Sequence, residues 1–508
     1  MRSPLPAALL ASTAAITAIA LVASGAVSEP VAEARTASAA TTIPPDKHVM
    51  FVGNNWAGTA TVVDVGTRKR IKTLNIIPDR AQELRDIYAS PDRLAFYLAV
   101  QQGVGEGHDQ YVDDMFTTRD GRLLVVSRPS FADVVWVDLA SGRVVREQQM
   151  DGYRTDHMGV SPNGRRLLVS DSTDRTVHEY AMGGKGNTST GKRLRTFPSG
   201  DTPHESSYTK DGARIVHASI GRVYTPFDYP QVGPIPAGVV HDTVKADRWL
   251  EVVRHSDFKI LRRWDMGKEL AEAGYPGLSS AVRPMALSPD EKVAYLQVSF
   301  LHGFVEFRLD RADPTGGGDY TVGTLREPTT GQVTRVANLP VKDEVQDMPR
   351  EQYVLDSAHH GIAMNKVGTR LCVAGTMSDY AAVVERSTFG YKLFKGRARF
   401  LANRAYAKPY WATTGKHDGK CWVSMSGSDL VTVIDYRTKR VIAEVPVGRH
   451  PQRVRDGLVD GVVLRAWRQG SASTRPDLSP VPIPAELRAA ADAYADQRLT
   501  DMSAVLDD

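Results

Sequence analysis

Short apolar runs separated by tight polar turns recur along most of this chain. β-branched residues dominate these runs, for example at residues 123–127, 293–298 and 431–435. Successive residues of a strand point to opposite faces, so runs that stay apolar throughout predict strands buried on both sides. The pattern therefore predicts an all-β protein with stacked sheets.

A turn signal precedes most of these runs. Its copies are Thr118-Arg-Asp-Gly121, Ser161-Pro-Asn-Gly164, Thr209-Lys-Asp-Gly212, Ser288-Pro-Asp-Glu291, Asn365-Lys-Val-Gly368, Lys416-His-Asp-Gly419 and Val454-Arg-Asp-Gly457. Asp and Asn close such turns with their side chains, and Gly adopts the positive φ that they require. Each signal, with the runs around it, predicts a unit of four antiparallel strands.

Four-stranded units that recur about every 40 to 50 residues are typical of a β-propeller. The number of turn signals predicts a seven-bladed β-propeller over residues 48–457. Residues 48–79 supply only three strands, and residues 450–457 supply one more. We expect these N- and C-terminal strands to pair and close the ring, which removes both sheet edges.

The last repeat resembles a known family. Residues 431–457, VTVIDYRTKRVIAEVPVGRHPQRVRDG, are similar to the YVTN-type (YncE-like) secreted β-propeller repeat. The resemblance covers about residues 48–457 and is most faithful in blades three, five and seven. Val169-Ser-Asp171 and Val423-Ser-Met425 stand where that family has Val-Ala-Asn. The resemblance implies an exported, WD40-like propeller and gives no reaction.

The N-terminal segment differs in composition from the rest. Arg2 precedes an apolar, Ala-rich run at residues 7–23, and Ala37-Ser38-Ala39 is a candidate cleavage site, with Ser24-Gly25-Ala26 as an alternative. This pattern predicts a signal peptide at residues 1–39, the alternative being an uncleaved N-terminal anchor. No later apolar run reaches the length of a membrane helix. We expect a secreted or cell-envelope protein without a membrane span in the mature chain.

The composition and net charge restrict the class of protein and the partners that it can bind. The 508 residues are 42% hydrophobic and 24% charged, with a formal net charge of +4. These values exclude a disordered chain and a strongly basic nucleic-acid binder. We expect a monomer that does not bind nucleic acid.

The two cysteines, Cys372 and Cys421, belong to the exported portion, where oxidation is permitted. Strand parity points their side chains toward each other from adjacent blades. Facing sheets, however, lie about 10 Å apart, and a disulfide needs Cα atoms within about 7 Å. The spacing therefore favours two buried free thiols over a disulfide.

Long insertions fall on one face of the predicted propeller. They occupy residues 80–110, 225–247, 268–281, 342–356 and 395–407. Residues 81–100 predict a helix broken at Ser90-Pro91, and residues 268–273 predict a short helix. Beyond the propeller, residues 462–464 predict a strand and residues 484–505 a helix in a C-terminal tail, 458–508. Long loops on a rigid scaffold commonly carry binding sites, so this face is the expected ligand face.

Polar residues gather where the innermost strands begin, at the channel mouth on that face. One column of the repeat contains Asp113, Asp156, His204, Arg283, His360, Trp411 and Arg449, and the next contains His157, Glu205 and His450. His157 and His450 differ in parity from His204 and His360, so we expect that not all of them face the axis. The candidate ligand-binding residues are Asp113, Asp156, His157, His204, Glu205, Arg283, His359, His360, Trp411 and His450.

Three interpretations of this mouth stay open. His204, His360 and Asp113 have the side chains that bind Zn, Cu, Fe, Ca or Mg. Alternatively, Arg283, Arg449 and Lys408 clamp an anion, with His204 or His360 as acid or base. The third interpretation is a channel lined by polar groups and water.

The sequence contains no GxSxG or HExxH motif and no cysteine pair with metal-site spacing. The leading hypothesis is therefore an exported propeller that binds a small molecule, glycan or protein on its long-loop face. The alternative is a metal-assisted hydrolase (a lactonase, for example), lyase or oxidoreductase that uses the mouth residues. No catalytic residue and no cofactor is assigned beyond a divalent or transition metal.

Overall fold

A computed structural model describes residues 43–221, 231–232, 235–236, 247–276, 278, 281–310, 332–349, 352–353, 357–401, 403–472 and 475–507. The expected signal peptide, residues 1–39, lies outside this described part, as does most of the expected insertion at residues 225–247. Side-chain statements end at residue 497.

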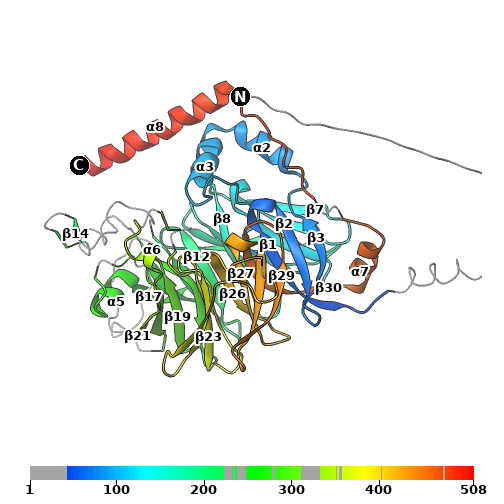
Figure 1. Cartoon of the computed structure of the whole chain (residues 1–508). Helices are drawn as coiled ribbons and strands as arrows, with labels where there is room; N and C mark the ends of the chain where they lie inside the picture. The colour runs from blue at the N-terminus through cyan, green and yellow to red at the C-terminus, as the bar shows by residue number, and fades with distance from the viewer. Residues whose placement is uncertain are drawn as a thin grey trace, which may run out of the picture. The chain divides into compact units, whose positions relative to one another are not determined.

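The strands form seven sheets of four antiparallel strands, the blades of a β-propeller (Figure 1). Blade one contains β1 (Lys47–Asn54), β2 (Thr59–Asp64), β3 (Arg70–Asn75) and β30 (Pro451–Val459). Blade two contains β4 (Met115–Thr117), β5 (Leu123–Arg128), β6 (Asp133–Asp138) and β7 (Val144–Gln149). Blade three contains β8 (Thr155–Val160), β9 (Arg166–Asp171), β10 (Thr176–Ala181) and β11 (Arg193–Pro198).

The second half of the ring repeats this plan. Blade four contains β12 (Pro203–Tyr208), β13 (Arg214–Ser219), β16 (Trp249–Arg254) and β17 (Ile260–Asp265), with the small hairpin β14 (Gln231–Val232) and β15 (Ile235–Pro236) between β13 and β16 in the chain. Blade five contains β18 (Val282–Leu287), β19 (Val293–Val298), β20 (Gly303–Arg308) and β21 (Val333–Asn338). Blade six contains β22 (Ile362–Met364), β23 (Arg370–Gly375), β24 (Tyr380–Glu385) and β25 (Tyr391–Lys395). Blade seven contains β26 (Pro409–Thr414), β27 (Cys421–Met425), β28 (Leu430–Asp435) and β29 (Arg440–Pro446).

The ring closes as the sequence predicts. β30, the last strand of the chain, pairs antiparallel with β1, the first, so that Val49 lies opposite Gly457 and Phe51 opposite Arg455. The innermost strand of blade one therefore comes from the C-terminal end of the propeller. β1 is thereby paired on both edges, with β2 and with β30.

Burial follows the position of a strand within its blade. Every residue of β6 and β28 is buried, because each middle strand is covered by a blade on either side. β7, at the outer edge, is mostly exposed. The turn signals act as expected: the Thr118 hydroxyl donates to Asp120 Oδ1 at 2.5 Å, and Gly121 has a φ of 62°. The predicted all-β, seven-bladed propeller is confirmed.

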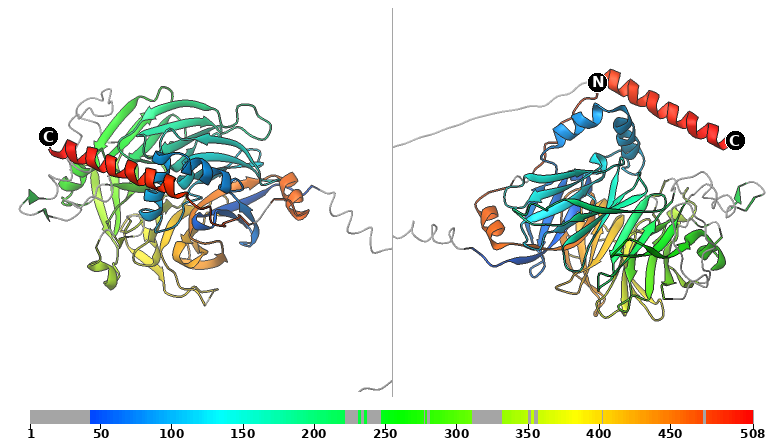
Figure 2. Two further views of the ribbon diagram at one scale, coloured as in Figure 1. Left: turned by 90° about the horizontal axis from the view of Figure 1, so that it is seen from above. Right: turned by 180° about the vertical axis from the view of Figure 1, so that it is seen from behind.

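Helices occupy the insertions and the tail. The break at Ser90 separates α2 (Arg80–Tyr88) from α3 (Pro91–Gln102), as predicted. The other helices are α5 (Met266–Glu272), α6 (Asp343–Gln346), α7 (Gly461–Arg468), α8 (Ala485–Asp507) and the 3-10 turns η1 (Asn55–Ala57), η2 (Pro129–Phe131) and η5 (Ser426–Ser428). α8 packs against α3, as Figure 2 shows. None of the described helices has the length and apolar composition that crossing a membrane requires.

Two local expectations are wrong. Residues 462–464 lie in α7, where the Asp460 carboxylate caps the helix by accepting from Val462 N at 2.7 Å. Cys372 and Cys421 form a disulfide between blades six and seven, with Cα atoms 6.3 Å apart. Blades are sectors that converge toward the axis, so their inner parts approach more closely than the parallel sheets on which the expectation of free thiols was based.

Candidate functional site

Five innermost strands begin with a register shift against their neighbouring strand. One of them is β30, where the shift falls between Pro451 and Val454. The other four shifts fall at Thr155/Met158, Pro203/Ser206, Val282/Met285 and Pro409/Ala412. An extra residue in a strand interrupts the alternation of side chains and re-aims them. His157, His204, Arg283 and Trp411 lie within these four shifts. The bulges therefore let residues of different parity converge at the channel mouth.

Three histidines converge there from three blades. His157 lies on β8, His204 on β12, and His360 directly before β22. One ring nitrogen from each lies within 4.8 Å of the others. The ring centroids of His157 and His204 are 3.7 Å apart, and each is 6.2 Å from that of His360. We call His157, His204 and His360 the histidine cluster.

The histidine cluster is buried and short of hydrogen bonds. Each of the three histidines is at most 2% exposed. His157 Nδ1, His204 Nδ1 and both ring nitrogens of His360 have no hydrogen-bond partner among the described residues. Burial lowers the pKa of all three imidazoles well below the ordinary value, and the nearby Arg453 guanidinium lowers those of His157 and His360 further. The cluster is therefore neutral at physiological pH, which is the form that binds metals.

Aromatic rings enclose the cluster. His360 stacks on Tyr410 with ring centroids 3.9 Å apart. The Trp411 ring lies 5.8 Å from His157 and 6.0 Å from His360. No hydrogen bond from Tyr410 or Trp411 to the unpartnered imidazole nitrogens forms among the described residues, so these rings enclose the cluster without satisfying those nitrogens.

Carboxylates surround the cluster, and most are paired with arginines. Asp113 lies 3.2 Å from Arg453 Nη2, and Asp156 accepts from Arg154 at 2.9 Å. Asp113, Asp156 and His157 also form a group whose ligand atoms lie within 4.8 Å of one another. Burial raises the pKa of Asp113 and of Glu205 to about 7. Burial alone would raise the pKa of Asp156 as well, but Arg154 and His204 hold it below its ordinary value.

The structure thus brings His204 and His360 together with His157, while Asp113 faces Arg453. Glu205 Oε2 accepts from Met285 N at 3.1 Å and lies 3.9 Å from His157 Nδ1. Arg283 donates from Nε to Ser299 Oγ at 2.6 Å.

Other predicted residues lie outside the cluster. His359 Nε2 hydrogen-bonds to the Tyr380 hydroxyl at 2.9 Å. His450 stacks on Trp56 with centroids 3.9 Å apart. Of the cations in the anion-clamp interpretation, Arg283 donates to Ser299, Arg449 is exposed, and Lys408 pairs with Glu106 at 3.0 Å.

Sequence reasoning missed Arg453 and Arg455 of β30. Arg453 is 1% exposed and lies over Trp411, with its guanidinium carbon 4.0 Å from the ring centroid. Arg455 lies over the same ring at 4.7 Å and pairs with Asp114. Their alternation on the closing strand was the available signal, because the two side chains of such a pair share one face.

The long-loop face is joined by polar contacts. Glu106 of the first insertion pairs with Lys408, whose backbone nitrogen donates to Asp379 at 2.9 Å. Lys342 of another insertion donates to the same Asp379 at 2.8 Å. Four segments that are distant in sequence therefore meet on one face.

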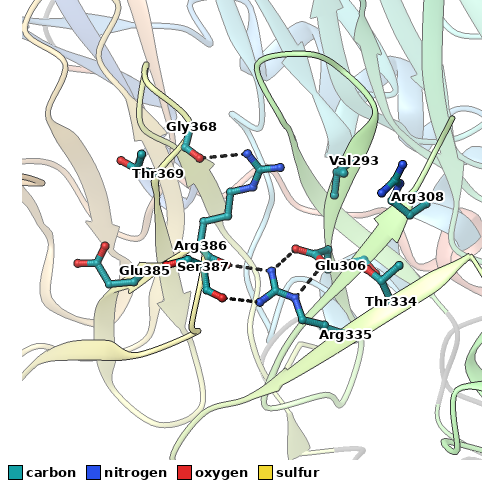
Figure 3. A pocket seen from close by; sticks show the side chains of 10 residues that line it. All are labelled: Val293, Glu306, Arg308, Thr334, Arg335, Gly368, Thr369, Glu385, Arg386 and Ser387. Carbon is teal, nitrogen blue, oxygen red and sulfur yellow. Dashed lines mark hydrogen bonds and ion pairs between the residues drawn. The ribbon is translucent and has the colours of Figure 1, made fainter.

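A second hollow lies between blades five and six, away from the channel mouth. We call it the interblade groove; its volume is about 730 Å³ (Figure 3). Arg335 pairs there with Glu306 and donates to Ser387 O at 2.9 Å. Arg386 donates to Gly368 O and, at 2.6 Å, to the Tyr295 hydroxyl. Its principal charged groups are therefore already engaged.

Comparisons with known proteins do not assign the chain to a family. No family model matches the chain, and no curated protein matches it. Among solved structures, the chain is similar to a chain of Kuenenia stuttgartiensis hydrazine synthase, with a TM-score of 0.45 and 14% identity over 67% of this chain and 88% of that one. The propeller itself is shown by the seven sheets, and the YVTN-type resemblance remains a resemblance.

Proposed function

We propose that this protein is an exported β-propeller that binds a transition-metal ion through His157, His204 and His360. The observation that carries this proposal is the convergence of three buried imidazoles. One nitrogen of each lies within 4.8 Å of the others, and each ring has at least one nitrogen without a partner in the described structure. A buried polar atom without a partner costs about 1–3 kcal/mol. A metal ion would satisfy one such atom on each ring at once.

The three imidazole ligands restrict which metal ions suit the site. Three neutral imidazoles suit Zn²⁺ and Cu²⁺, whereas Ca²⁺ and Mg²⁺ require oxygen ligands. If His157 binds through Nδ1, its Nε2 faces Asp156 Oδ1 at 3.6 Å. A carboxylate behind a metal-binding histidine orients the ring and increases its basicity. We therefore assign Zn²⁺ or Cu²⁺ to the histidine cluster.

Three protein ligands leave a coordination position for another molecule. Structural zinc sites use four protein ligands, whereas catalytic sites use three and keep one position for water or substrate. The proposal therefore favours a metal centre that binds and activates a small molecule. Glycan or protein binding on the long-loop face is the alternative, and it is favoured by the contacts that join three insertions there.

Elemental analysis tests the metal. The mature protein would be purified from its own secretion without chelators or affinity metals, alongside His157→Ala, His204→Ala and His360→Ala. His359→Gln is the matched control, because His359 is equally buried but bonded to Tyr380. We expect one Zn or Cu per chain in the wild type and the control, and none in the three variants. A folded wild-type protein that stays metal-free even after incubation with Zn²⁺ and Cu²⁺ would refute the proposal.

A further inference from the structure

Arg453 is buried beside the histidine cluster with part of its guanidinium unused. Its Nη2 contacts both Asp113 oxygens at 3.2 Å. Its Nε and Nη1 have no hydrogen-bond partner in the described part of the chain. A charged group that is 1% exposed normally has its donors paired, because water cannot solvate it.

Arg455, two residues along the same strand, provides the internal comparison. It lies over the same Trp411 ring, yet its Nε and Nη2 each donate to an Asp114 oxygen at 2.7 Å. Its carboxylate partner is thus bound by two donors, which is the strong bidentate arrangement. Arg453 shares the stacking on Trp411, but its carboxylate engages only one of its nitrogens, Nη2.

Shared neighbours place Arg453 next to the proposed metal. Its guanidinium carbon is 4.0 Å from the Trp411 ring centroid and 5.9 Å from that of Tyr410. His360 stacks on Tyr410, and His157 meets Trp411 edge to face. Arg453 and the histidine cluster therefore share the Trp411 and Tyr410 rings as neighbours.

The charges around the histidine cluster favour an anionic ligand. Imidazoles bind metals in their neutral form, so a divalent ion held by the histidine cluster would bring two positive charges. Four carboxylates lie beside it, and four arginines balance them in number: Asp113, Asp114, Asp156 and Glu205 against Arg453, Arg455, Arg154 and Arg283. Uncompensated charge in a buried site is costly, and an anionic ligand removes that cost.

We infer that the centre takes a small carboxylate, with one oxygen on the metal and Arg453 Nε or Nη1 donating to the carboxylate group. This inference rests on the proposed metal site and names the class of its ligand. A buried water molecule at the same donors is the competing occupant. Water is neutral, so a site that holds only water would respond equally to a charged ligand and to a neutral ligand of the same shape.

Cobalt substitution provides the measurement. The metal-free protein would be loaded with Co²⁺, whose visible spectrum reports on its ligands, and titrated with sodium acetate and with neutral acetamide. We expect acetate to change the spectrum saturably and acetamide to have no effect at equal concentration. Equal responses to acetate and acetamide, or no response to acetate in cobalt-loaded protein, would overturn the inference without the need for any variant.

Two variants locate the ligand. Arg453→Lys keeps the charge and loses the planar donor set, so the acetate Kd should rise about ten-fold or more, as expected for the loss of a charge-assisted hydrogen bond. Arg455→Lys is the matched control and should change the Kd less than about two-fold, because its donors serve Asp114. Cobalt content and thermal unfolding measured on both variants exclude a loss through misfolding, and Arg453→Gln replaces Arg453→Lys if the latter does not fold. An unchanged Kd in folded Arg453 variants would overturn the assignment.

Failure of the metal proposal is separable from failure of this one. If the wild type binds no metal, calorimetry with acetate on the metal-free protein decides the anion site alone. Heat of binding that disappears in Arg453→Lys would uphold an anion site without a metal, and no heat in the wild type would refute both proposals.

Discussion

The channel mouth and the interblade groove are both rich in arginines and carboxylates, yet they differ in how these groups are used. In the groove, Arg335 is bound by Glu306, Arg386 by Tyr295 and Gly368, and Glu385 by Arg370 and Lys439. At the mouth, His360 and Arg453 are buried with unpaired nitrogens. The groove is a defined hollow, but its charged side chains already have partners. The two regions thus differ in their unsatisfied buried atoms rather than in the abundance of charged groups.

The largest expected effect breaks a pair at the mouth. Asp113→Ala leaves the buried Arg453 charge without its carboxylate, and we expect the metal-free protein to lose about 3–5 kcal/mol of unfolding free energy. Glu385→Ala in the groove removes a more exposed acceptor and should cost about 1 kcal/mol or less. Urea unfolding of both variants checks the contrast. Equal losses would show that the two regions are alike energetically.

The disulfide ranks next. It joins blade six, which carries His360 and one wall of the groove, to blade seven. Replacing both Cys372 and Cys421 by Ser removes a cross-link between residues 49 apart. The unfolded chain then gains entropy that corresponds to about 4 kcal/mol in the loop-closure model. Chemical denaturation measures the loss. The metal content of the double variant should be unchanged. A loss of bound metal would show that the histidine cluster depends on the disulfide.

Metal binding itself stabilises the folded chain. At Zn²⁺ or Cu²⁺ concentrations 100 times the Kd, the free energy of unfolding should rise by about 2.7 kcal/mol. His360→Ala should abolish this gain, whereas Arg386→Ala in the groove should leave it intact. Thermal unfolding with and without metal tests the difference. Stabilisation of His360→Ala equal to that of wild type would place the metal elsewhere.

The smallest effect per step of the experiment concerns pH. It contrasts a buried histidine whose two nitrogens are bonded with the histidines of the cluster, which have unbonded nitrogens. Both nitrogens of the buried His217 are bonded, to Ser199 at 2.7 Å and Ser206 at 2.9 Å, and burial lowers its pKa to about 3. Because the unfolded state binds its proton near pH 6.5, the stability that His217 contributes is complete above that pH. It is lost as the pH falls toward 3.

For one histidine the slope is about 1.4 kcal/mol per pH unit within that window. His217→Gln should therefore show a shallower fall of unfolding free energy between pH 6 and 4 than wild type, measured by urea unfolding of metal-free protein. A slope unchanged by this substitution would contradict the assigned pKa shift.

The propeller was predictable because its determinants are local. The turn signal ending at Gly121 and the buried run of β6 each specify one hairpin or strand, and their repetition specifies the ring. Closure followed from counting strands at the two ends. The strand expected at residues 462–464 failed because the Asp460 cap starts a helix there, a signal visible in the sequence but outweighed by the apolar run.

The site was predictable only in outline. Repeat alignment placed His204 and His360 at the mouth, but parity separated His157 from them. The register shift at Thr155/Met158 undoes that parity, and nothing local in the sequence marks it. Arg453 was missed for a related reason: its side chain matters because Asp113 occupies only one of its nitrogens, and such partial pairing depends on contacts between the two ends of the propeller.

The pairing of β1 with β30 also sets the order in which the molecule is completed. A ribosome makes β30 after every other strand of the propeller, so a growing chain holds His157, His204 and His360 before it holds Arg453. Until residue 459 has been made and has left the ribosome, blade one lacks its axial strand, and its β1 edge can pair with other chains. A truncation before residue 451 would therefore yield an open arc that is prone to aggregation, with its anion-binding arginine missing.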